Sequence, residues 1–428
     1  MKRKIAIWGG GAYGTFIFEK IQEYRCDEYE IKYIADKNAE SLQKKFDIPV
    51  VTPQEIISLY RDKKIDGVLV GVTWLPYERE MLKFLHENEI PEITILKDTD
   101  FVLSDKLDYV EKNVIQCYPG YSINSIEDAY IKCNVEFNDV TYVYTSDGTI
   151  IRDTWNAWGV RTIHKNYPLK FDKSYWDDCE KIEELCMLAG CFQFNYWHVT
   201  FEMLDKLFVM VKSGYKGKYL MYETGFNKQL IELFDIEESR IIWIKDGAPS
   251  PKYLHVSKLY YVVCDYKDRH LHASVLDKAA EYLIEKSHSC EREFGKRVFF
   301  KRIGVRQLLG ADKILEDYGF EVVIPEELTL MEQIKCFNGA DIVLCPHGAG
   351  SSNSLYMKKG SHFIETFSRD YINPLCIQVI QKRNVNYHML VELEDYNHME
   401  KWDRDRDYKL LPDLLKMTIE QIINNNYV

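Results

Sequence analysis

The chain has 428 residues, which is enough for two or three domains that each bury a core of their own. Its formal net charge at pH 7 is -12, whereas proteins that bind nucleic acids concentrate Lys and Arg on their surfaces. This charge argues against a nucleic-acid partner, and an anionic nucleotide would have to be held by local donors.

The cysteines and the apolar runs predict a cytoplasmic protein. None of the eleven cysteines forms a C-x-x-C pair, a pattern that favours reduced thiols over a disulfide framework. The N-terminal stretch has only a short apolar run before its glycines and is not expected to be a signal peptide. No apolar run reaches the length that spans a bilayer, and a peripheral association with a membrane stays open.

Residues 1–104 are predicted to form a small Rossmann-like domain. The stretch KIAIWG is typical of a strand, and Gly9, Gly11 and Gly14 form a G-x-G-x-x-G motif directly after it, where a helix begins. A second predicted strand places Asp36 where it can meet a ribose hydroxyl. Strands and helices continue to alternate up to about residue 98.

Two interpretations of this first domain stay open. It resembles the small nucleotide-binding domains at the front of bacterial surface-polysaccharide enzymes, which implies a bound nucleotide. About 100 residues leave no room for a separate substrate-positioning domain. In the second interpretation the glycines only form the turn and let the helix pack closely, and no ligand is bound.

Residues 103–123 are polar and weakly patterned, with a Pro119–Gly120 breaker, and predict a linker. Residues 135–151 alternate as strands do, and Asp147–Gly148 is a hairpin signal. We expect a second domain over residues 105–265 that begins here.

An aromatic run opens the next informative helix. In NYWHVTFEMLDKLF, His198, Glu202 and Asp205 lie at i, i+4 and i+7, which places them on one face of a continuous helix. An imidazole oriented by a carboxylate one turn away can act as general base toward a sugar hydroxyl. Which of the three is the base is left open. The alternative is that His198 caps the helix and both carboxylates are solvated.

A third domain is predicted over residues 266–428. Strands are expected at 298–300, 320–324, 342–345 and 361–366, with helices at 311–318, after a Thr329/Glu332 capping box, and over 410–424. This order is half of a doubly wound sheet. Arg302 and Arg306 follow the first of these strands, where planar guanidinium groups can reach a pyrophosphate.

The stretch DIVLCPHGAGSSNSLYMKKGSHFIE is the most informative part of the chain. A buried strand is predicted to open through His347, Gly348, Ala349 and Gly350 into a helix, whose free backbone N–H groups favour a bound phosphate. Glu365 comes at the carboxyl end of the next strand, where a carboxylate can accept hydrogen bonds from ribose hydroxyls. The alternative is that the glycines only connect two elements.

The run DRDRD at 403–407 imitates the Asp-x-Asp metal motif found in some sugar transferases. Arg404 and Arg406 interleave with its carboxylates, so a solvated turn is predicted instead. With no metal-ligand cluster visible, we expect protein cations to neutralise a pyrophosphate.

These motifs resemble glycosyltransferase family 61, which is also known as a domain of bacterial capsule clusters. The resemblance covers residues 142 to about 425 and is strongest between 298 and 367, in the run from Arg302 through LTLMEQI to HGAGSSNSLYM and FIE. The stretch GCFQFNYWHVTFEMLDKLFVM is similar to another motif of that family. The chain departs from the family pattern at Gly310–Ala311 and at Asp205–Lys206.

The resemblance implies a GT-B-like pair of Rossmann-like domains, with an acceptor half (105–265) and a donor half (266–428) that follow the additional domain. It implies an inverting transfer from a nucleotide-sugar donor, with UDP as the expected nucleotide, to a glycan or lipid-linked glycan in capsular polysaccharide synthesis. No cofactor is expected for this transfer, and a nucleotide in the first domain stays open. The donor-binding residues are expected to be Arg302, Arg306, Gln333, His347, Gly348, Ala349, Gly350, Asn353 and Glu365.

Two rival functions are kept. One is a nicotinamide-dependent, sugar-modifying oxidoreductase that works from the G-x-G-x-x-G motif and Asp36. The other is a non-catalytic, sugar-nucleotide-binding assembly protein of a polysaccharide pathway, in which loss of His198 would have no effect on function.

Overall fold

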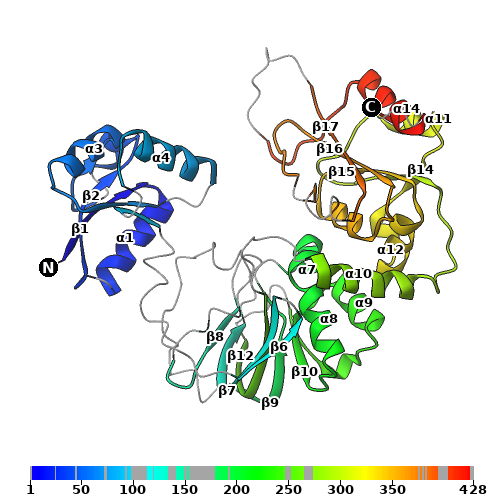
Figure 1. Cartoon of the computed structure of the whole chain (residues 1–428), viewed down its shortest axis with the longest axis horizontal. Coiled ribbons are helices and arrows are strands. Elements are labelled where there is room, and N and C mark those ends of the chain that lie inside the picture. The colour runs from blue at the N-terminus through cyan, green and yellow to red at the C-terminus, as the bar shows by residue number, and fades with distance from the viewer. Residues whose placement is uncertain are drawn as a thin grey trace. The chain divides into compact units, whose positions relative to one another are not determined.

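The computed structural model describes residues 2–24, 26–43, 46–71, 75–91, 94–97, 113–118, 120–133, 141–148, 151, 154, 179–190, 193–245, 252–264, 273–374, 376–377, 380, 383–393 and 403–424. Strands and helices alternate along most of these residues (Figure 1). The chain divides into two compact units, Met1–Glu111 with Tyr144–Ser174 and Lys112–Val143 with Tyr175–Val428. The boundaries predicted near residues 104 and 265 lie outside the described residues.

The first unit contains a five-stranded parallel sheet in the order β3-β2-β1-β4-β5. Its buried strand residues and the apolar faces of α3 and α4 share one core, which is why the predicted alternation of elements is found. The strands are β1 (Arg3–Trp8), β2 (Tyr29–Ala35), β3 (Val50–Val51), β4 (Gly67–Val70) and β5 (Ile95–Lys97), and the helices are α1 (Ala12–Tyr24), α2 (Ala39–Leu42), α3 (Pro53–Arg61) and α4 (Leu75–Glu87).

The second unit begins with a mixed seven-stranded sheet in the order β11-β10-β9-β12-β7-β6, with β8 paired to β7. β9 to β12 run parallel to one another, whereas β7 is antiparallel to β12 and to β6. The strands are β6 (Asn113–Tyr118), β7 (Tyr121–Cys133), β8 (Tyr142–Tyr144), β9 (Glu180–Met187), β10 (Lys218–Tyr222), β11 (Ile241–Ile244) and β12 (Lys252–Cys264). The helical segments are α7 (Tyr196–Glu202), α8 (Leu204–Lys212), α9 (Gly225–Leu233), η4 (Glu238–Arg240) and α10 (Ala273–Ser287).

The predicted linker over 103–123 is wrong in its second part, because β6 and the start of β7 occupy 113–123. Polar and apolar residues do not alternate regularly there, and the adjacent apolar residues Val114 and Ile115 are both exposed, so the sequence carries little periodic strand signal. Residues 103–112 lie outside the described residues. The predicted Asp147–Gly148 turn is present, and Gly148 adopts φ 90°.

The last sheet is fully parallel, in the order β14-β13-β15-β16-β17. The Thr329/Glu332 capping box is confirmed, and the predicted helix after the glycine turn is a 3-10 helix. The elements are β13 (Arg297–Phe300), α11 (Asp312–Asp317), β14 (Glu321–Val323), η5 (Pro325–Glu327), α12 (Leu330–Gly339), β15 (Ile342–Pro346), η6 (Ala349–Tyr356), β16 (His362–Phe367), β17 (Asn386–Val391) and α14 (Pro412–Ile423).

Both faces of this sheet are covered, as a parallel sheet requires. Phe299 and Leu344 point to one side and pack with α11 and the tail helix α14. Phe300 and Val343 point to the other side and pack with α12. That second core continues without interruption into α7, α8, α9 and β10, so one hydrophobic cluster serves both sheets of the unit (Figure 1).

Candidate active site

The carboxyl ends of β13, β15 and β16 meet at one edge of the last sheet, because these strands are parallel neighbours. Arg302 lies two residues beyond β13, and His347 lies one residue beyond β15. Glu365 pairs in register with Cys345 of β15. The residues that the sequence singled out are thus collected at the edge where open α/β sheets bind ligands.

Arg302 contacts the loop that carries His347. Its Nη1 donates to the carbonyl oxygen of His347 at 3.3 Å, and its Nε donates to the carbonyl oxygen of Val305 at 2.6 Å. A Cβ atom on Gly348 would lie 1.7 Å from Nη1 of Arg302. Gly348 is therefore needed for the guanidinium to lie against this loop.

Three donors at this edge have no hydrogen-bond acceptor among the described residues: Nη2 of Arg302 and the backbone amides of Ala349 and Gly350. The two amides belong to the first turn of η6, where backbone N–H groups lack intrahelical partners. The amide of His347 is already bonded to the carbonyl oxygen of Thr366 at 2.9 Å. An anionic group could accept hydrogen bonds from these unused donors.

A buried carboxylate holds the imidazole of His347. Oε1 of Glu365 lies 2.7 Å from Nδ1 of His347, and Oε2 accepts a hydrogen bond from the hydroxyl of Tyr387 at 2.8 Å. The His347 ring also stacks on Phe367, with 4.8 Å between centroids. Because the Nδ1–H of His347 is donated to Glu365, Nε2 is the ring nitrogen left for a ligand.

Glu365 has no exposed surface, and each of its oxygens already has a partner. A ribose contact, as the sequence predicts, would require this carboxylate to leave His347 or Tyr387. In this structure Glu365 orients the imidazole instead. Burial and the neighbouring Glu365 carboxylate raise the pKa of Tyr387, which keeps that hydroxyl protonated as a donor.

Arg306 lies in the loop that follows β13, four residues after Arg302, and its backbone conformation is unusual. Its φ is +58°, in the left-handed region that non-glycine residues rarely adopt. Its guanidinium lies over the Tyr371 ring, 5.2 Å from the centroid, and its Nε is 3.6 Å from Oδ1 of Asp405. Asp405 belongs to the DRDRD run, so that run is in contact with the loop that follows β13.

The predicted solvated turn is present at 404–405, where Asp403, Arg404 and Asp405 are exposed, but the rest of the DRDRD run is held by contacts. Oδ1 of Asp407 accepts the backbone N–H of Gln307 at 2.7 Å, and Arg406 pairs with Asp370 and Glu392. These contacts fasten the segment to the loop after β13 and to the ends of β16 and β17.

Gln333 and Asn353 were predicted to shape the donor pocket but lie in a buried chain of hydrogen bonds. Nδ2 of Asn353 donates to Oε1 of Gln333 at 2.9 Å, and the hydroxyl of Tyr196 donates to Oδ1 of Asn353 at 2.7 Å. Asn353 has no exposed surface. These hydrogen bonds connect α12, η6 and α7, and so join the elements of the last sheet to the helix that carries His198.

His198 and Glu202 are brought together as predicted, with 2.9 Å between Nδ1 and Oε2. Asp205 is not on the same helix: α7 ends at Glu202, Met203 breaks the helical conformation, and α8 begins at Leu204. Oδ2 of Asp205 accepts a hydrogen bond from the hydroxyl of Tyr121 at 2.6 Å, and its exposed fraction is 2%. The continuous helix that would align all three residues is a wrong prediction, because the break rotates Asp205 toward β7.

The N-terminal motif is built as a tight turn. A Cβ atom on Gly14 would lie 1.6 Å from the carbonyl oxygen of Gly9, whereas one on Gly11 would meet nothing within 4 Å. Both oxygens of Asp36 accept backbone amides, from Gly10 at 2.8 Å and from Asn38 at 2.9 Å. Gly14 is thus required for close packing, and Asp36 stabilises its own loop.

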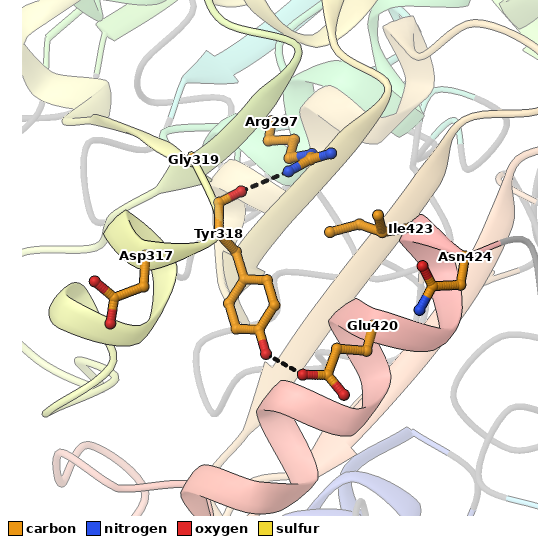
Figure 2. Close-up of a pocket in the computed structure, with 7 residues that line it drawn as sticks. All are labelled: Arg297, Asp317, Tyr318, Gly319, Glu420, Ile423 and Asn424. Atoms are coloured by element: carbon orange, nitrogen blue, oxygen red, sulfur yellow. Dashed lines mark hydrogen bonds between the residues drawn. The ribbon is translucent and has the colours of Figure 1, made fainter.

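A hollow in the described part of the chain lies elsewhere. It has a volume of about 480 Å³ and is lined by Arg297, Asp317, Tyr318, Gly319, Glu420, Ile423 and Asn424 (Figure 2). Arg297 begins β13, so this hollow lies at the amino edge of the sheet, opposite His347. Arg297 donates to the carbonyl oxygen of Tyr318 at 2.7 Å, and Tyr318 bonds to Glu420 (Figure 2). These contacts fasten α14 to the sheet.

Two features are absent from the residues that the structure describes. These residues contain no group of three or more His, Cys, Asp or Glu side chains arranged to hold a metal ion. Nor does any helix among them combine the length and the apolar character needed to cross a membrane.

Comparison with known proteins decides the class of enzyme. Residues 196–364 match the family model described as Glycosyltransferase 61. This protein is a glycosyltransferase. The matched residues run from the start of α7 into β16, so they include His198, Arg302 and His347, and Glu365 follows one residue later. The N-terminal glycine motif lies outside the match.

Two solved structures are similar to this chain, both with low TM-scores. A mutant of the flavo di-iron protein from Thermotoga maritima is 10% identical, with 92% of this chain and 87% of that chain covered and a TM-score of 0.22. The E. coli ADP-heptose lps heptosyltransferase II is 8% identical, with 99% of each chain covered and a TM-score of 0.19. No curated protein matches the chain.

The sequence reasoning missed Tyr387 and Tyr371. Tyr387 lies on the edge strand β17, which the sequence analysis did not predict, although NVNYHMLV has strand-like β-branched and aromatic residues. Tyr371 follows β16 in a polar loop and carries no sequence signal of its own.

Proposed function

We propose that this glycosyltransferase moves a sugar from a nucleoside diphosphate donor, with UDP as the nucleotide, to a hydroxyl of a surface or capsular polysaccharide. The observation that supports this most is the contact of Arg302 with the His347 loop. It gathers a guanidinium, an oriented imidazole and unused backbone amides at the carboxyl edge of a parallel sheet.

In the proposed reaction these groups act on the leaving diphosphate. As the bond from the anomeric carbon to the diphosphate oxygen breaks, negative charge grows on that oxygen. Arg302 and the amides of Ala349 and Gly350 donate to it, and Nε2 of His347 donates to it in the imidazolium form, in which both ring nitrogens carry hydrogen. Donors that are already in place when the charge develops lower the barrier most. This arrangement needs no metal ion, because protein donors take up the charge.

The acceptor is activated on the opposite side of the sugar. His198 is held by Glu202 and takes the proton of the acceptor hydroxyl, while that oxygen forms the new bond to the anomeric carbon. Attack opposite to the departing diphosphate inverts the configuration. The proton passes from the imidazole to solvent after the product leaves.

A binding measurement tests the donor site. We expect UDP to raise the melting temperature of the wild type, since a ligand at a hundred times its dissociation constant stabilises a protein by about 2.7 kcal/mol. Arg302→Ala should lose this shift. Arg297→Ala, which removes an arginine from the opposite end of β13, is the matched control and should keep it. An unchanged shift in Arg302→Ala would remove Arg302 from the site.

A transfer assay tests the reaction itself. A panel of UDP-sugars with polysaccharide acceptors, read out as released UDP, should give turnover in the wild type and little in His347→Ala. Because His198 is proposed to act on the acceptor hydroxyl and not on the nucleotide, His198→Asn should still bind UDP. Full activity in His347→Ala would contradict the proposed mechanism.

A further inference from the structure

The segment 403–408 brings one more arginine to the donor edge. The backbone amide of Arg306 donates to the carbonyl oxygen of Asp405 at 3.1 Å, and that of Tyr408 donates to the carbonyl oxygen of Gln307 at 3.0 Å. Arg404 is therefore carried at a fixed place beside the loop of Arg302 and Arg306, although about a hundred residues separate them in sequence.

Tyr371 is the centre of this group of side chains. The guanidinium carbon of Arg404 lies 4.6 Å from the centroid of the Tyr371 ring, and that of Arg306 lies 5.2 Å from it. Both distances are typical of cation–π contacts. The ring of His347 lies 5.3 Å from the same centroid. Two arginines and the oriented imidazole thus surround one aromatic ring.

The positive charge of this group is poorly balanced. Within the described residues, Asp405 is the one carboxylate in an ion pair with these arginines, at 3.6 Å from Nε of Arg306. Arg302 and Arg404 have no ion pair there, and Nε of Arg306 is buried without a hydrogen bond. Burial lowers the pKa of Arg306, and the nearby charges of Arg302 and Arg404 lower it further.

The backbone of Arg306 supports a functional reason for this arrangement. Its φ of +58° is costly for a non-glycine residue and persists where surrounding contacts enforce it. Here the Asp405 and Tyr371 contacts do so. A strained backbone that holds a partly buried, incompletely paired guanidinium next to other cations is suited to a bound polyanion.

We propose that Arg404 and Arg306, positioned by Tyr371, bind one phosphate of the nucleoside diphosphate donor, beside the phosphate that Arg302 and the η6 amides bind. This assignment rests on the proposed function. It adds a donor contact from the C-terminal segment, forty residues beyond the end of the family match. It also gives the DRDRD run a role in which Arg404 is the ligand-binding residue and its acidic residues hold the loop.

Isothermal titration of the full chain with UDP and with uridine tests this assignment. Arg404 is exposed, so Arg404→Gln should fold normally, which a melting curve checks. One charged hydrogen bond to phosphate predicts that Arg404→Gln binds UDP about tenfold more weakly than the wild type and binds uridine equally well. Lys409→Gln removes an exposed positive charge from the same segment and is the matched control.

The outcomes separate the two proposals. If the wild type binds UDP and Arg404→Gln binds it equally well, Arg404 is not a phosphate ligand while the donor site stands. If Lys409→Gln weakens UDP as much as Arg404→Gln does, the effect is general electrostatics and the assignment fails. If the wild type binds neither UDP nor the diphosphates of the other common nucleosides, the proposed function fails and the role of Arg404 with it.

Discussion

The hydroxyl of Tyr387 donates to Glu365 at 2.8 Å, on the carboxylate oxygen opposite to the one that holds His347. Glu365 is fully buried, so both of its oxygens depend on these partners. The pair makes the edge strand β17 part of the site, because it fixes the carboxylate that fixes the imidazole.

Tyr387→Phe should therefore act through His347. The change leaves one buried carboxylate oxygen without a donor, at a cost of about 1–3 kcal/mol in unfolding free energy. Since the imidazole then loses its fixed orientation, kcat should fall while KM for the donor changes little. Steady-state kinetics and denaturant unfolding measure the two effects. A variant that loses stability but keeps the kcat and pH profile of the wild type would make Tyr387 purely structural.

Gly348→Ala should disable the donor site although no charged residue is replaced. Its Cβ would lie 1.7 Å from Nη1 of Arg302, so the guanidinium must move away from the His347 loop. We expect loss of UDP binding in a titration. Gly339→Ala is the control, because a Cβ there meets nothing within 4 Å, and its effect on stability should stay within about 1 kcal/mol. Normal UDP affinity in Gly348→Ala would mean that this position of Arg302 is not needed.

The His198–Glu202 pair predicts a separation of binding from chemistry. His198→Asn and Glu202→Gln should each lower the transfer rate, by about 10²-fold or more for His198, and should leave UDP affinity unchanged. Because one residue orients the other, the double variant should be little slower than His198→Asn alone. Rates that multiply in the double variant would show that the two residues act independently.

A second histidine pair predicts how stability depends on pH. Nδ1 of His362 lies 3.0 Å from Nε2 of His388, where β16 pairs with β17. Burial lowers the pKa of His362, and burial together with the nearby His362 lowers the pKa of His388 to about 4. Both groups thus favour the neutral form in the folded state. Their contribution is fully present above the unfolded pKa of about 6.5 and is lost as the pH falls toward 4.

Urea unfolding between pH 7.5 and pH 4 measures this contribution. We expect the midpoint to fall with pH, and we expect His388→Gln to flatten part of that decrease, since glutamine does not titrate. The same slope in wild type and variant would assign the pH dependence to other groups. The experiment is independent of any ligand.

Much of the last sheet and its helices could be predicted from local sequence rules. Apolar runs bounded by Gly or Pro gave β13, β15 and β16, and the Thr329/Glu332 signature gave the start of α12. The placement of Arg302 beside His347 could also be anticipated, because both follow strands that end at the same edge. These features depend on interactions near in sequence or on a repeated topological rule.

The remaining features depend on contacts between distant residues. The break at Met203 rotates Asp205 away from His198 and toward Tyr121, and helical periodicity alone does not reveal it. Glu365 looked like a ribose acceptor from its place on a strand, but Tyr387 and His347 occupy its oxygens. Arg404 is exposed, as a solvated turn predicts, but its contact with Tyr371 joins residues that lie far apart in sequence. Side-chain partners of this kind are fixed only by the packed tertiary structure.

The hydrophobic cluster shared by β10, α8, α12 and β16 has a consequence for dissecting the enzyme. Cutting the polypeptide between the two sheets would expose Leu207 and Tyr219 to water on one fragment, and Phe300 and Val343 on the other. Neither fragment would be expected to remain monomeric when expressed alone. A fragment that keeps this core intact therefore includes everything from β6 through α14, with both sheets in a single piece.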